Sequence, residues 1–154
     1  MNTESIWDEY KNSLSEFLTK DAKDDILKIV DQGSLKMISH SDMEDNDGTT
    51  QARIVDQKKK YTIEFKESVL RSRFRCWKVA LIAHEFCHML TYADENVDTQ
   101  DKIDRLPHHG QAFQSTVRRS VRSSVIKREV LKKVGSRPSC VYKNRNMCRW
   151  CNGD

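Results

Sequence analysis

Two histidines and a glutamate lie close together in the stretch "VALIAHEFCHMLTYAD", residues 79–94. His84 and His88 are four residues apart, and Glu85 directly follows the first of them. On a helix, residues four apart differ by roughly 40° in direction and by about one turn in height, so both imidazoles can reach one ion. Glu85 then points roughly 100° away from His84, which suits a general base beside the ion rather than a ligand.

Zinc is the metal that this pattern favours. Two neutral imidazoles, one further ligand and an open position form a common catalytic zinc site, in which zinc lowers the pKa of a water to roughly 7. The chain contains 5 histidines, and a random order of its residues would give this pattern only about 1% of the time. Without a metal, unpaired ionisable groups inside an apolar helix would be costly.

A third ligand is needed, and among the histidines only His40, His108 and His109 remain. His109 is the best candidate, because it precedes Gly110, which permits close backbone approach, and begins the next expected helix. His108 is its rival and otherwise a neighbour of the site. His40 lies in an acidic loop, and we interpret it as a surface residue.

Around these residues the sequence resembles the SprT-like (Spartan-like) zinc metalloprotease family. The resemblance rests on "TIEFKESVLRSRFRCWKVALIAHEFCHML" followed by "HHGQAF", and it covers roughly residues 50–125. The family's pattern is a β-hairpin, a helix bearing H-E-x-x-H, a variable insert, and H-G-x-x-F at the start of the next helix. The resemblance implies that His84, His88 and His109 bind a catalytic zinc ion and that Glu85 is the catalytic residue.

The resemblance also implies a function, since members of this family are proteases that act near DNA, in eukaryotes on proteins crosslinked to it. For this chain it implies a zinc-dependent endopeptidase that cleaves DNA-bound or DNA-crosslinked proteins in the nucleus, as in DNA–protein crosslink repair. The expected partners are protein substrates and single-stranded or junction-containing DNA. We expect a monomer that does not bind membranes.

The elements that must position these residues follow from hydrophobic spacing. The order of these expected elements indicates an α+β fold. It has N-terminal helices, a small antiparallel sheet, the H-E-x-x-H helix, a following basic helix and a short tail that contains cysteines. We expect one small zincin-like domain over residues 1–135 and the tail over residues 136–154. Expected helices cover 4–18, 21–31, 76–92 and 111–134, expected strands cover 34–38, 52–56 and 61–65, and polar connections cover 39–50, 57–60 and 94–104.

Charge is distributed unevenly along the chain. Residues 1–57 contain 6 Lys/Arg and 13 Asp/Glu, whereas residues 105–154 contain 12 Lys/Arg and 2 Asp/Glu. A basic block of this size suggests a polyanionic partner such as DNA, and a solvated helix face is the alternative. On the basic helix, the residues expected to contact DNA are Arg118, Arg119, Arg122, Lys127 and Arg128.

The tail carries Cys140, Cys148 and Cys151, and its C-x-x-C pair is half of a zinc ribbon. A second, structural zinc ion needs a fourth ligand from Cys76, a histidine, a partner or a segment outside this chain, and the alternative is three free thiols. Members of the resembled family often carry a zinc-binding subdomain here that contacts DNA. Tail residues expected to contact DNA are Lys143, Arg145, Arg149 and Trp150, the last by stacking on unpaired bases.

Two other functions compete with the protease. One is a non-catalytic nucleic-acid-binding module with a structural zinc ion, although such a zinc needs no base in the position of Glu85. The other is a metal-dependent hydrolase that works independently of DNA. The first residues lack the basic-then-apolar order of a signal peptide, and the apolar runs are too short to cross a bilayer, so we expect an intracellular protein.

Overall fold

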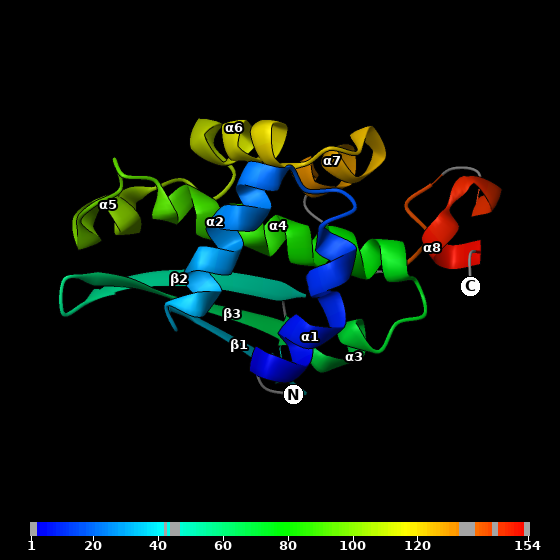
Figure 1. Ribbon diagram of the computed structural model, residues 1–154, viewed down its shortest axis with the longest axis horizontal. Helices are drawn as coiled ribbons and strands as arrows, with labels where there is room; N and C mark the ends of the chain where they lie inside the picture. Colours follow the sequence, from blue (N-terminus) through cyan, green and yellow to red (C-terminus); the bar gives the residue numbers. More distant parts are fainter. Residues whose placement is uncertain (1–2, 42, 44–46, 133–137, 143–144, 153–154) are drawn as a thin grey trace.

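The computed structural model describes residues 3–41, 43, 47–132, 138–142 and 145–152, which form helices around a small sheet (Figure 1). This arrangement confirms the α+β class. The strands are β1 (Leu35–His40), β2 (Gly48–Val55) and β3 (Lys58–Lys66). The helices are α1 (Thr3–Leu14), α2 (Lys20–Asp31), α3 (Glu67–Leu70), α4 (Arg75–Ala93), α5 (Gln100–Arg105), α6 (Gln111–Ser120), α7 (Ser124–Leu131), the 3-10 turn η1 (Arg145–Met147) and α8 (Arg149–Asn152).

The sheet is mixed rather than purely antiparallel, in the strand order β1-β3-β2. β2 and β3 form the expected antiparallel hairpin, whereas β1 pairs in parallel with the other side of β3. The hairpin turn is shorter than the expected connection over residues 57–60. Asp56 and Gln57 both have positive φ values, 50° and 66°, which is the backbone of a two-residue type I′ turn. Lys58–Lys60 therefore belong to β3, and β2 is an edge strand.

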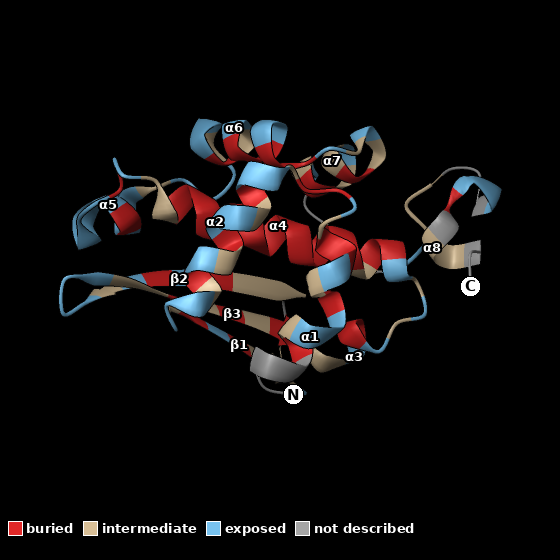
Figure 2. Ribbon diagram, in the orientation of Figure 1, coloured by how far each residue is buried: buried red, intermediate tan, exposed pale blue. Residues whose placement is uncertain are grey.

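The helix with the H-E-x-x-H pattern, α4, lies between the sheet and the pair α6 and α7 (Figure 1). Every residue from Val79 to Tyr92 is buried, whereas the helices around α4 expose their outer faces (Figure 2). Burial on all sides explains why apolar residues continue around this helix, instead of forming one stripe. Among the described residues, no helix is both long and apolar enough to cross a membrane.

The prediction of a single basic helix over residues 111–134 is wrong, because this segment forms two helices, α6 and α7. Val121 leaves the helix and forms an isolated antiparallel bridge with Leu18. Next to this bridge, the Thr19 N–H donates to the Ser120 carbonyl at 2.8 Å. Ser123 then starts α7 by accepting a hydrogen bond from the Ile126 N–H at 3.3 Å. Long-range backbone pairing and a new N-cap thus override the continuous valine spacing.

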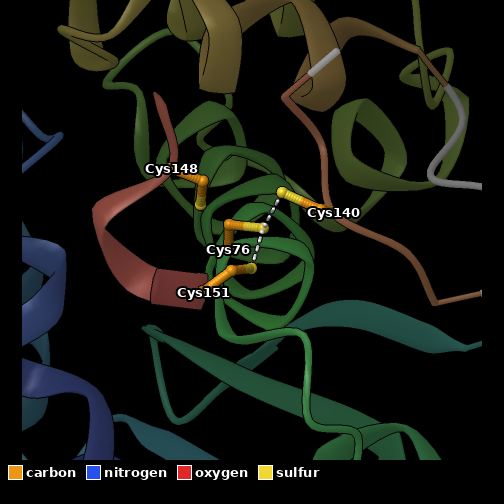
Figure 3. Close-up of side chains that lie close together, drawn as sticks. All are labelled: Cys76, Cys140, Cys148 and Cys151. Carbon is orange, nitrogen blue, oxygen red and sulfur yellow. Dashed lines mark hydrogen bonds between the residues drawn. The ribbon is translucent and has the colours of Figure 1, made fainter. Parts of the chain in front are cut away.

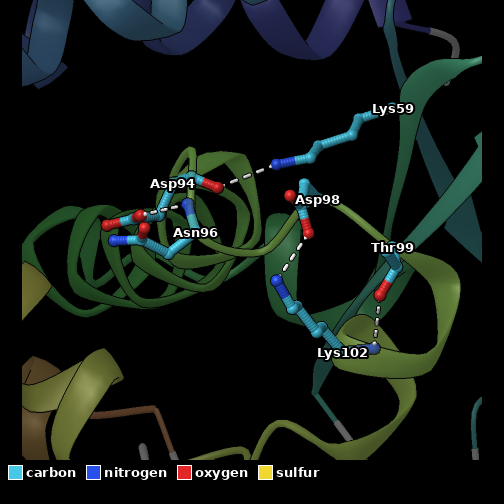
Figure 4. A network of polar contacts seen from close by, with 6 residues as sticks. All are labelled: Lys59, Asp94, Asn96, Asp98, Thr99 and Lys102. Atoms are coloured by element: carbon cyan, nitrogen blue, oxygen red, sulfur yellow. Dashed lines mark hydrogen bonds and ion pairs between the residues drawn. The ribbon is translucent and has the colours of Figure 1, made fainter.

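The acidic connection over residues 94–104 contains α5, which the hydrophobic spacing did not predict. Thr99 caps α5 by accepting from the Lys102 N–H at 3.2 Å, and Lys102 also pairs with Asp98 at 2.7 Å (Figure 4). From β3, the Lys59 ammonium donates to the Asp94 carbonyl at 2.8 Å. The Lys59 contact holds the segment after α4 against the hairpin, whereas the other two contacts lie within the segment.

Candidate metal centre

The structure brings three of the histidines together on one side of α4. The Nε2 atom of His84 lies 3.1 Å from the Nε2 atoms of both His88 and His109. His84 and His88 come from α4, and His109 comes from the loop immediately before α6. His84 and His88 are buried, whereas His109 is exposed, so the cluster faces solvent on the His109 side.

These distances fit three ligands around a single zinc ion. Tetrahedral zinc with Zn–N bonds of about 2.05 Å separates its nitrogen ligands by about 3.3 Å, and two of the nitrogen pairs here are 3.1 Å apart. The three histidines therefore form a candidate zinc site. Three protein ligands leave a fourth tetrahedral position for water or substrate, which is the arrangement of catalytic rather than structural zinc.

The histidine rings are oriented by contacts outside the cluster. The Nδ1 atom of His84 lies 2.7 Å from the carbonyl oxygen of Val130 in α7. A carbonyl can only accept, so Nδ1 carries the proton and the Nε2 lone pair of His84 is free for a metal. Phe113 of α6 stacks on His88 with centroids 4.2 Å apart and meets His84 and His109 edge-on at 5.0 and 5.2 Å.

Burial keeps both α4 histidines neutral near pH 7. It lowers the pKa of His84 to about 4, although the Val130 carbonyl acts in the opposite direction and the nearby His109 adds to the lowering. It lowers the pKa of His88 to about 2, with His84, His109 and His108 contributing further. A neutral imidazole is the form that binds a metal, so no proton needs to be displaced from these rings.

Glu85, which follows His84 on α4, makes a side-chain hydrogen bond to β2. Its Oε1 atom accepts a hydrogen bond from the Thr50 hydroxyl at 2.8 Å. Burial raises the pKa of Glu85 to about 7, although the Thr50 hydrogen bond lowers it. Gly48, two residues before Thr50, packs closely against this carboxylate, because a Cβ atom there would lie 3.2 Å from Glu85 Oε2. A carboxyl group with a pKa near neutrality can both accept and return a proton.

The other two histidines take no part in this cluster. The ring of His108 lies 5.9 Å from that of His88, centroid to centroid, and His108 is not among the three clustered histidines. His40, at the end of β1, lies 3.1 Å from the carboxylate of Glu64 in β3. Among the residues that shape the site, Thr50, Gly48 and Val130 were not predicted from the sequence.

A second cluster joins the tail to α4, as Figure 3 shows. Cys140, Cys148 and Cys151 surround Cys76, which lies in the first turn of α4, and the four sulfur atoms are within 4.8 Å of one another. Cys76 is therefore the residue that completes a candidate four-cysteine metal site. Cys87, also on α4, is buried outside this cluster.

The basic residues expected to contact DNA are distributed over α6, α7 and the tail. Arg118, Arg119, Arg122 and Arg128 are exposed, and Lys127 is half-buried. In the tail, Trp150 is half-buried, and its indole N–H donates to the Glu16 carboxylate at 2.9 Å. Lys143 and the side chains of Arg145 and Arg149 lie outside the described residues.

A cavity of about 720 Å³ lies elsewhere, between α2 and the C-terminal end of α4, and no histidine lines it. It is therefore separate from the histidine cluster, where the ligand atoms converge.

No protein-family model, no curated protein and no solved structure matches this chain. What identifies the site is the convergence of His84, His88 and His109 beside the buried Glu85.

Proposed function

We propose that the protein is a zinc-dependent endopeptidase of the SprT-like type, which cleaves DNA-bound or DNA-crosslinked proteins in the nucleus. One observation carries the catalytic part of this proposal: the buried Glu85 lies next to three convergent histidines, two of them on the same helix. A structural zinc site would need neither an open position nor a carboxyl group with a raised pKa.

The chemistry follows from these side chains. Zinc bound by the three histidines would polarise the scissile carbonyl and lower the pKa of a water molecule. Thr50 occupies Oε1 of Glu85, which leaves Oε2 to accept the proton of the attacking water and to return it to the leaving amine. The hydrogen bond between Val130 and His84 keeps the ring in the tautomer that binds metal.

The edge strand β2 supports a peptide as the substrate. The Ile54 N–H points away from β3, because it donates to the Gln100 side chain in α5 at 2.9 Å. Successive residues of a strand point their backbone N–H and C=O groups to opposite sides. The N–H and C=O groups of Thr50 and Ala52 therefore also point away from β3. An extended peptide can add to this edge through main-chain hydrogen bonds, and Thr50 brings that edge to Glu85.

Two features support an association with DNA. The last third of the chain has a large excess of basic residues, and the four arginines of α6, α7 and their junction are exposed. Contacts between such side chains and phosphates give affinity that does not depend on base sequence. Because α6 begins shortly after His109, DNA bound along this helix would deliver attached proteins to the histidine cluster.

Cleavage of histone and casein, with and without single-stranded DNA, tests the proposal. Zinc-loaded protein should cleave both substrates, chelator-treated protein neither, and DNA should accelerate cleavage of histone more than of casein, since only histone binds the same DNA. Equal rates with and without DNA would indicate a DNA-independent hydrolase. Zinc and DNA binding without any cleavage would indicate a non-catalytic module.

A further inference from the structure

The four-cysteine cluster combines residues that are far apart in the sequence. Cys76 Sγ lies 3.4 Å from Cys151 Sγ and 3.8 Å from Cys140 Sγ (Figure 3). Cys148 completes the group, and both Cys76 and Cys148 have no exposed surface. The cluster is therefore built into the fold, with one member from the first turn of α4 and three from the tail.

The sulfur separations match tetrahedral zinc better than disulfides. Zn–S bonds of about 2.3 Å separate the sulfur atoms of a tetrahedral site by about 3.8 Å, whereas a disulfide requires about 2.05 Å. In addition, the Val141 N–H donates to Cys76 Sγ at 3.4 Å. Backbone amide donors of this kind stabilise the negative charge that thiolates carry around a metal.

We propose that Cys76, Cys140, Cys148 and Cys151 bind a structural zinc ion that fastens the tail to the start of the H-E-x-x-H helix. Four thiolates fill a tetrahedral zinc ion, so no position remains for water and the site has no hydrolytic role. Binding exchanges four thiol protons for one Zn²⁺ ion and involves no oxidation. The tail thus completes its site within this chain and needs no ligand from a partner.

The fastened tail reaches the region that carries the exposed arginines. The Trp150 indole N–H donates to Glu16, and its ring packs edge-on against Phe17 with centroids 6.3 Å apart. The next residue, Leu18, forms the bridge to Val121 at the α6–α7 junction. A chain of contacts therefore links the cysteine site, through the α1–α2 connection, to the junction. Loss of the zinc should release Trp150 from Phe17.

Metal analysis of variants tests this site separately from the histidine site. Wild-type protein should bind two zinc ions, one for each candidate cluster. A variant with His84, His88 and His109 all replaced by alanine should keep one zinc. Adding Cys76→Ser should remove that zinc and change the part of the tryptophan fluorescence that is absent in Trp150→Phe, since Trp7 and Trp77 also fluoresce. The matched control is Cys87→Ser, because Cys87 is equally buried in α4 but lies outside the cluster.

Cobalt substitution gives a second measurement that does not depend on folding of the Cys76→Ser chain. In the triple-histidine variant, bound Co²⁺ should show the intense visible absorption of tetrahedral thiolate ligands, and Cys140→Ser should weaken it. The proposal is overturned if Cys76→Ser retains both metals, or if thiol reagents modify all four cysteines equally fast with and without zinc. A mass lower than that of the reduced chain, indicating a disulfide, would also overturn it.

Discussion

At the scale of single residues, the candidate site depends on atoms that contact a functional side chain without reacting themselves. Thr50 holds one oxygen of Glu85, and the carbonyl of Val130 fixes the protonated nitrogen of His84. Gly48 limits the space around the other oxygen of Glu85. Each of these contacts orients a group whose position matters to within fractions of an ångström.

Gly48→Ala should therefore impair cleavage without removing zinc. The added methyl group would lie 3.2 Å from Oε2 and 3.3 Å from Cγ of Glu85, so the carboxylate must move. A displacement of 1 Å can cost about 100-fold in rate, so the few tenths of an ångström required here should lower kcat by roughly 3- to 10-fold. The control is Thr49→Ala in the same strand. Full activity in Gly48→Ala would show that Glu85 tolerates displacement.

The part of this site that could be predicted from the sequence consists of residues that are close together in the chain. His84, Glu85 and His88 belong to one helix, so their spacing alone fixes their relative directions. His109 required a judgement between neighbouring histidines, and the structure places it in the cluster. Thr50 and Gly48 come from a strand more than thirty positions away, and a backbone carbonyl such as that of Val130 has no signature in sequence.

At the scale of elements, the break between α6 and α7 is what brings a carbonyl to His84. In a single straight helix over residues 111–134, the last turns would continue along the axis of α6 and away from α4. Instead, α7 begins after its N-cap Ser123 and packs against α4. The sequence contained the signal for this break, since Ser123 is a good N-cap residue. The regular spacing of the valines nevertheless predicted one continuous helix. The helix ends because Val121 pairs with Leu18, a long-range contact that the spacing does not reveal.

Ser123→Ala should weaken both α7 and zinc binding. Loss of an N-cap costs about 0.5–2 kcal/mol, which should lower the melting temperature by a few degrees. Because α7 carries the Val130 carbonyl, zinc affinity should also fall, by less than the 10- to 100-fold typical of removing a ligand's direct partner. A chelator competition assay measures it.

The control for this experiment is Ser124→Ala, which changes the exposed residue next to the cap. It should leave the melting temperature and zinc affinity nearly unchanged, since exposed substitutions usually alter stability by less than about 0.5 kcal/mol. If Ser123→Ala lowered stability but left zinc affinity at the wild-type value, α7 would have no part in orienting His84.

At the scale of the whole molecule, the uneven charge distribution links the fold to the proposed function. The N-terminal third is acidic, and the basic excess falls on the segment that begins near His109. The sequence predicted this asymmetry directly, because charge counts need no knowledge of the fold. It did not predict that two helices and their junction, rather than one helix, display the arginines.

Reversing the charge of Arg118, Arg122 and Arg128 to glutamate should weaken DNA binding and DNA-stimulated cleavage together. All three are exposed, so zinc content and melting temperature should change little. On single-stranded DNA, the slope of log affinity against log salt should become less steep by roughly 0.7 for each phosphate that the variant no longer neutralises. Fluorescence anisotropy across a salt series measures both the affinity and the slope.

The matched control reverses Lys36, Arg53 and Lys58, which are exposed residues of the sheet with the same total charge change. This variant should bind DNA nearly as well as the wild type if the basic segment is the binding surface. Equal weakening in both variants would mean that only net charge matters, and unchanged binding after reversal of the three arginines would leave that segment as a solvated surface.

The most direct test of the central claim is the zinc content and cleavage rate of Glu85→Gln, measured side by side with the wild type. The amide retains the shape of the side chain but cannot accept a proton from water. We predict full zinc occupancy and a native melting curve, with cleavage reduced by about 10²- to 10⁴-fold, the usual cost of removing a general base. Undiminished proteolysis by zinc-loaded Glu85→Gln protein would contradict the account.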